Sequence, residues 1–122
     1  MIYIGIDPGA KGGIAYIEDV AGIGLSCEAH PYSRYTLLAL ANEWREKDKA
    51  VCCLENVHSM PKQGVKSTFA FGESFGYIKG VLESFEIPYQ EVAPNKWKKE
   101  FSLIGKDKAA SIAQGSCFLE FL

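Results

Sequence analysis

The chain has 122 residues, of which 48% are hydrophobic and 23% are charged. This suits one globular domain over residues 1–122 that folds around its own core without a metal or disulfide. The formal net charge of −2 argues against a protein that coats nucleic acid, and no apolar run has the length of a membrane span. The start, MIYIGIDPG, lacks the features of a signal peptide, so we expect a cytoplasmic protein.

Three short strands are predicted first, at residues 2–6, 12–18 and 25–29. Residues 35–47 have helical spacing, with an apolar side made by Leu37, Leu38, Leu40, Ala41 and Trp44. The fully apolar run at residues 50–54 is predicted to be a fourth strand.

Residues 58–66 are polar and predicted to form a loop, followed by a long helix over 67–85. Phe69, Phe71 and Phe75 are expected to be mostly core, with the alternative that one of them faces a partner helix in a dimer. Gly72, Gly76 and Gly80 indicate tight packing of the helix on the sheet. A fifth strand at 88–92, a helix capped by residues 93–95 and running to 101, and a last helix from about residue 106 complete the chain.

The predicted order is β-β-β-α-β-α-β-α-α. Short turns make the first three strands an antiparallel meander, whereas helical crossovers make the later strands parallel. We therefore expect an α/β fold with a mixed five-stranded sheet flanked by helices.

The four cysteines contain no CxxC pair, and no histidine spacing completes a zinc site. Cys52 and Cys53 are neighbours in a predicted strand and should point to opposite faces. With Cys27 and Cys117, they are expected to be small buried hydrophobic residues in a reducing compartment.

Two acidic residues follow predicted buried strands: Asp7 after the first and Glu55 after the fourth. If these strands are neighbours in the sheet, both carboxylates lie at one end of it, where they repel each other unless a proton or cation intervenes. Carboxylate oxygens favour Mg²⁺ or Mn²⁺, and two such ions can support hydrolysis of a phosphodiester.

Glycines surround Asp7 in the stretch IDPGAKGG. Gly9, Gly12 and Gly13 leave room for a sugar-phosphate backbone, and Lys11 is a candidate phosphate contact. The alternative is an ordinary turn in which glycine supplies a positive φ.

Lysines supply the other candidate DNA contacts. Lys62 and Lys66 lie in the loop after Glu55, where the alternative is ordinary loop charge. A local excess of positive charge between residues 96 and 108 is the second basic stretch, and its alternative is a solvated helix face.

Three blocks together resemble the RuvC-like Holliday junction resolvases, especially the short phage and prophage type. They are IGIDPGAKGGIA, CLENVHSMPKQGVKSTFAFGESFGYIKGVL and APNKWKKEFSLIGKDKAAS, in the family's order and over essentially the whole chain. The resemblance implies an RNase H-like fold and a Mg²⁺- or Mn²⁺-dependent endonuclease, usually a homodimer, that places paired nicks in four-way DNA junctions.

Residue by residue, the resemblance implies that Asp7 and Glu55 are catalytic metal ligands of the first and fourth strands. It places Lys98, Lys99, Lys106 and Lys108 along the DNA. The family's base-stacking aromatic residue shortly after the fourth-strand acid has no counterpart here, because the first aromatic residue after Glu55 is Phe69.

Resolvases of this kind also carry one or two acids on a C-terminal helix, and we expect this chain to lack that helix. Glu120 and Asp107 do not match those acids. One alternative function is therefore a catalytically inactive DNA-binding or dimerisation module. Another is a fragment of an actin-like ATPase, whose phosphate hairpin also has a strand, an Asp and a Gly-rich turn.

Overall fold

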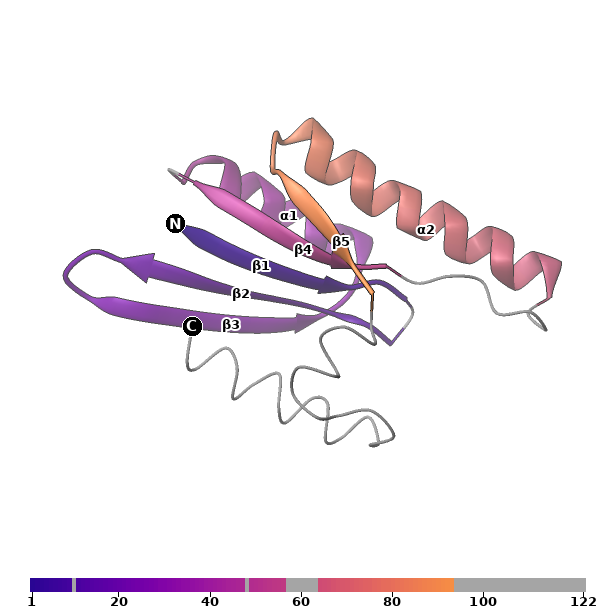
Figure 1. Ribbon diagram of the computed structural model, residues 1–122, viewed down its shortest axis with the longest axis horizontal. Coiled ribbons are helices and arrows are strands. Elements are labelled where there is room, and N and C mark those ends of the chain that lie inside the picture. Colours follow the sequence, from indigo (N-terminus) through magenta and orange to yellow (C-terminus); the bar gives the residue numbers. More distant parts are fainter. Residues whose placement is uncertain (10, 48, 57–63, 94–122) are drawn as a thin grey trace.

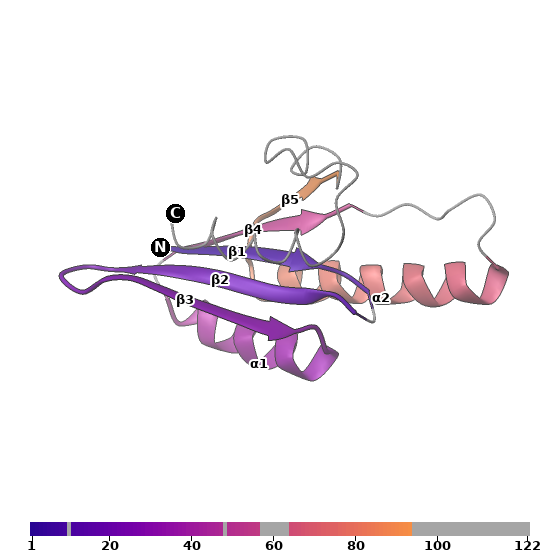
Figure 2. The ribbon, with the colours of Figure 1, turned by 90° about the horizontal axis from the view of Figure 1, so that it is seen from below.

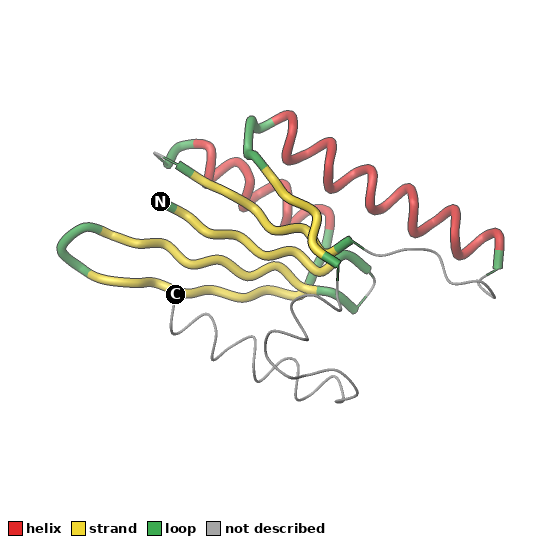
Figure 3. Tube along the Cα trace, in the orientation of Figure 1, coloured by secondary structure: helices red, strands yellow, loops and turns green. Residues whose placement is uncertain are grey.

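The computed structural model describes residues 1–9, 11–47, 49–56 and 64–93. This part of the chain forms five strands and two helices, whose arrangement can be followed in Figures 1 and 3. The strands are β1 (Ile2–Asp7), β2 (Gly13–Val20), β3 (Gly24–Pro31), β4 (Ala50–Glu55) and β5 (Tyr89–Val92), and the helices are α1 (Arg34–Arg45) and α2 (Val65–Ser84). The helices expected after residue 93 lie outside the described residues.

The strands form one sheet in the order β3-β2-β1-β4-β5. β1, β2 and β3 pair antiparallel, whereas β4 pairs parallel to both β1 and β5. This is the predicted mixed sheet, with a meander at one side and two crossover strands at the other.

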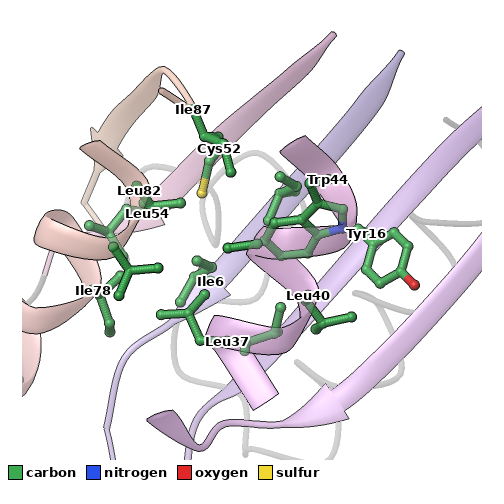
Figure 4. Packing of buried hydrophobic residues seen from close by; sticks show 14 of the residues in the cluster. Ile6, Tyr16, Leu37, Leu40, Trp44, Cys52, Leu54, Ile78, Leu82 and Ile87 are labelled. Atoms are coloured by element: carbon green, nitrogen blue, oxygen red, sulfur yellow. The ribbon is translucent and has the colours of Figure 1, made fainter. Parts of the chain in front are cut away.

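Both helices lie on the same face of the sheet (Figure 2). Alternate residues of β1 point toward them, so Ile2, Ile4 and Ile6 are buried. All three belong to one cluster with residues of both helices and of β4, and Figure 4 shows Ile6 within it. Trp44 packs edge-on against Tyr16, with 5.4 Å between ring centroids. The core therefore lies between the sheet and α1 and α2.

α1 begins one residue earlier than predicted because Ser33 caps it. The Ser33 hydroxyl oxygen accepts a hydrogen bond from the backbone N–H of Thr36 at 3.0 Å, which satisfies one of the free donors of the first turn. Leu38, predicted on the apolar side, is instead 43% exposed, whereas Leu37 and Leu40 are buried.

The prediction about the glycines of α2 is wrong. A Cβ added at Gly72, Gly76 or Gly80 would meet nothing within 4 Å, so none of them brings the helix closer to the sheet. Phe69 also differs from the expected core position, because it is 74% exposed. The side of α2 that packs on the sheet contains Ile78 and Leu82 instead.

The cysteine prediction holds only for Cys52, which is buried in the core, and burial raises the pKa of its thiol to about 12. Cys53 points to the opposite face, as strand geometry requires, and is exposed. Cys27 is also exposed, because β3 is an edge strand, and Cys117 lies outside the described residues.

Candidate active site

Asp7 and Glu55 are the last residues of two neighbouring parallel strands, β1 and β4. The final pair of this ladder is Ile6 with Leu54, so the two acids occupy equivalent positions one step further on. Adjacent strands of a sheet lie about 4.8 Å apart. The fold thus brings the two acids to one edge, as their positions after apolar strands predict.

The two acids also share a face of the sheet. Ile6 and Leu54 point into the core beneath α1 and α2, so the next residue of each strand points the other way. Asp7 is exposed and Glu55 is half-buried. Both carboxylates therefore lie on the face opposite the two helices, at its edge.

The turn between β1 and β2 also helps to fix the position of Asp7. The backbone N–H of Gly12 donates to the carbonyl of Gly9 at 3.1 Å, and Gly9 has a positive φ of 134°. A Cβ at Gly12 would overlap the carbonyl oxygen of Asp7 and lie 2.9 Å from its carbonyl carbon. Glycine at position 12 thus has a steric reason within the turn, in addition to the access for a substrate that the sequence suggests.

Lys11 and Lys66 are the candidate phosphate contacts that fall on described residues. Lys11 is exposed in the turn next to Asp7. Lys66 is exposed in the first turn of α2 and not in a loop as predicted, because the helix begins at Val65. The remaining candidates lie outside the described residues: Lys62, Lys98, Lys99, Lys106 and Lys108.

The chemistry of Asp7 and Glu55 fits a hard divalent cation. Mg²⁺ is typically bound by one or two carboxylates together with substrate phosphates and water, so two acids on one edge are a sufficient protein contribution for one ion. In the described part of the chain, no group of three or more His, Cys, Asp or Glu side chains could hold a metal. When bound, such an ion supplies Lewis-acid polarisation of a phosphoryl oxygen and lowers the pKa of bound water.

A polar cluster on β2 and β3 was not predicted. The hydroxyl of Tyr16 donates to Glu28 Oε2, and His30 Nε2 lies 3.2 Å from the same oxygen. Together they lower the pKa of Glu28, while burial and the Glu28 carboxylate raise the pKa of Tyr16. The available signal was the i, i+2 spacing of Glu28 and His30, which places both on one face of a strand.

This cluster lies on the helix-covered face of the sheet, whereas the two acids lie on the other. Tyr16 belongs to the core, and its β3 partner in the ladder is Glu28. We therefore separate the cluster from the candidate active site. None of the described helices is long and apolar enough to cross a membrane.

Comparisons with known proteins identify the fold. No family model matches the chain. A search of curated proteins also finds no match. Among solved structures, that of Thermus thermophilus RuvC matches with a TM-score of 0.56 and 15% identity over 84% of this chain and 70% of that one.

A second structure, of T. thermophilus RuvC in complex with Holliday junction substrate, matches with a TM-score of 0.57 and 15% identity. It covers 81% of this chain and 68% of that one. The mixed five-stranded sheet with its two helices is thus a RuvC-like, RNase H-like α/β fold.

Proposed function

We propose that the chain is a metal-dependent endonuclease that resolves four-way DNA junctions by phosphodiester hydrolysis, a resolvase of the short phage and prophage type. The observation that carries this proposal is the position of Asp7 and Glu55, each one residue beyond the last pair of the β1–β4 ladder, in a RuvC-like fold. The chemistry requires acidic ligands that are accessible from solvent, and these two lie on the sheet face that α1 and α2 leave uncovered.

In this proposal, Asp7 and Glu55 are the catalytic residues and hold Mg²⁺ or Mn²⁺. Lysines contact phosphates of the DNA and position the strand without reading its sequence. Lys11 stands nearest the acids along the chain and Lys66 at the start of α2, with Lys62, Lys98, Lys99, Lys106 and Lys108 as further contacts.

Cleavage of a labelled four-way junction in Mg²⁺ and in Mn²⁺ tests the proposal. We expect paired nicks that Asp7→Asn and Glu55→Gln each reduce at least about 100-fold, because each removes a charged ligand from a centre with few protein ligands. Asp19→Asn, at an exposed acid of β2 away from the site, is the matched control and should cleave like the wild type. Equal cleavage by the Asp7 variant and the wild type would exclude the proposed site.

A second candidate function is a RuvC-like module that binds junctions without cutting them. It is favoured by the described residues, where only two acids meet and no third ligand joins them. Junction binding in Ca²⁺, measured by gel shift beside the cleavage assay, separates the two functions. Binding without nicks in either Mg²⁺ or Mn²⁺ would establish the second.

We also propose that the protein is a single-domain, cytoplasmic homodimer that contacts its partner through residues 65–76 of α2. Val65 and Phe69 are 88% and 74% exposed, and Gly72 and Gly76 follow at helical spacing on the same side. Each glycine costs about 1 kcal/mol relative to alanine in a helix, and no described neighbour offsets that cost. Close approach of a second helix would offset it.

A further inference from the structure

A groove of about 320 Å³ runs between the second half of α2 and the exposed side of α1. It is lined by Leu38, Tyr77, Gly80, Val81, Ser84 and Phe85. The groove lies on the outer surface of the helices and is separate from the sheet edge with the two acids. It was not predicted from the sequence, which places Leu38 on the apolar side of the first helix.

The two helices that form the groove run in the same direction. Arg34, at the start of α1, lies over the ring of Tyr77, with 4.7 Å from the guanidinium carbon to the ring centroid. Arg45, at the end of α1, lies 5.7 Å from the ring centroid of Phe85, just after α2. Arg45 follows Arg34 by eleven positions, which correspond to about 16 Å of helix. An apolar groove thus has a cation at each end.

The two cations differ in how far they are neutralised. Arg34 Nη2 pairs with Glu73 Oε1 at 3.2 Å. Arg45 makes no ion pair with a described residue, and its contact with Phe85 is a cation–π interaction. The end of the groove at Arg45 therefore has the more available positive charge.

The groove offers little to orient a small polar ligand. The Ser84 hydroxyl already donates a hydrogen bond to the carbonyl oxygen of Gly80 at 2.7 Å. Gly80 presents bare backbone with no neighbour within 4 Å of an added Cβ, so a helix can approach α2 closely there. The groove between two parallel helices is a surface on which the apolar side of a third helix packs.

We propose that this groove binds a helical segment of another protein, with apolar residues that fill it and acidic residues that reach Arg45 and Arg34. Charge complementarity selects an acidic segment. The groove of a second copy of this chain has the same two arginines at its ends, so two grooves that face each other are not complementary in charge. This inference goes beyond the proposed nuclease and does not depend on it.

Binding of fluorescent peptides to the full chain tests the proposal. The probe is an amphipathic helical peptide of about 16 residues, roughly 24 Å long, with leucines along one side and glutamates at both ends. The matched peptide has lysines in place of the glutamates. We expect micromolar binding of the acidic peptide in an anisotropy titration, at least about tenfold weaker binding of the basic one, and weakening with added salt.

Two matched glycine variants locate the binding surface. Gly80→Leu places a side chain in the groove, and Gly76→Leu places the same side chain on the neighbouring turn outside it. Both fit sterically and both improve helix propensity, so both should fold. We expect Gly80→Leu to weaken binding of the acidic peptide about tenfold or more. Gly76→Leu should leave it unchanged even where it abolishes the proposed dimer, because Gly76 does not line the groove. Arg45→Glu should reverse the preference between the two peptides.

Three results would overturn the proposal. The first is the absence of binding of either peptide at 1 mM, and the second is equal affinity for both. The third is a Gly80→Leu protein that binds like the wild type. If Gly80→Leu instead converts a dimeric protein into a monomer, the groove belongs to a second copy of this chain and the acidic partner is excluded. Junction cleavage by Gly80→Leu reports separately on the nuclease and should equal that of the wild type.

Discussion

Gly12 is restricted to glycine by the backbone of Asp7, the residue proposed to bind the metal. The Cβ of any other residue would overlap the Asp7 carbonyl oxygen, and both the turn and the end of β1 would have to move. Ladder pairing of Asp7 with Gly13 makes this turn the direct continuation of the strand. The position of the Asp7 carboxylate therefore depends on the absence of a side chain at residue 12.

We predict that Gly12→Ala lowers the free energy of unfolding by about 2–3 kcal/mol, the cost of overpacking a well-defined site. The measurement is urea denaturation followed by circular dichroism. Gly5→Ala, in the middle of β1, is the matched control, because a Cβ there meets nothing within 4 Å. Equal stability of the two variants would show that the turn relaxes freely around the new methyl group.

The location of Asp7 and Glu55 at one edge of the sheet could be predicted from the sequence, because both acids end apolar strands and neighbouring parallel strands end at the same edge. The steric reason for Gly12 could not, because it depends on a backbone contact across a turn. The polar run at residues 58–66 predicts a loop at Lys66, whereas Gly64 starts the helix without a side-chain cap. A weak helix start leaves little signal in the sequence.

At the scale of elements, the Glu28 carboxylate on the edge strand β3 connects this strand to the core residue Tyr16. Glu28 accepts from Tyr16 and contacts His30 at 3.2 Å, and the Tyr16 and His30 rings stack with 6.4 Å between centroids. The pKa of Glu28 is lowered first by the Tyr16 hydroxyl and then by His30. A lowered pKa means that the folded protein prefers the ionised carboxylate.

This preference predicts a pH-dependent contribution of Glu28 to stability. The contribution is present above the unfolded pKa of 4.5 and is lost as the pH falls through the lower, folded value. The gap in free energy of unfolding between wild type and Glu28→Gln should therefore be largest near neutral pH and shrink below about pH 4.5. Urea titrations across this range measure it.

Asp19→Asn, at an exposed acid of the same hairpin, serves as the control for general acid effects. The pKa of Tyr16 is shifted in the opposite direction, upward from its ordinary value of 10. Its contribution to the free energy of unfolding is therefore complete below pH 10 and is lost as the pH rises through the folded pKa. A gap between wild type and Glu28→Gln that stays constant with pH would contradict the assigned role of Glu28.

At the scale of the whole molecule, the topology followed from two patterns that the sequence contains. Short turns predict the meander β1-β2-β3, and apolar strands separated by helices predict the parallel β4 and β5. The sequence does not predict which apolar residues of α1 and α2 are exposed. Helical spacing separates the apolar from the polar side of a helix, but it does not show which apolar residues the sheet leaves uncovered. Leu38, Val65 and Phe69 are examples, because all three are apolar and exposed.

Exposed apolar residues and glycines over residues 65–76 of α2 have a consequence for assembly. We predict that the wild type sediments as a dimer and that Gly76→Leu is monomeric, because a leucine at this position keeps the backbones of two α2 helices apart. The variant should also be more stable within the monomer, since the change raises helix propensity by up to about 1 kcal/mol. Loss of the dimer together with an unchanged or higher melting temperature separates an interface effect from misfolding. Gly80→Leu, one turn further along and outside the proposed interface, should remain dimeric, and a monomeric wild type at micromolar concentration would exclude this assembly.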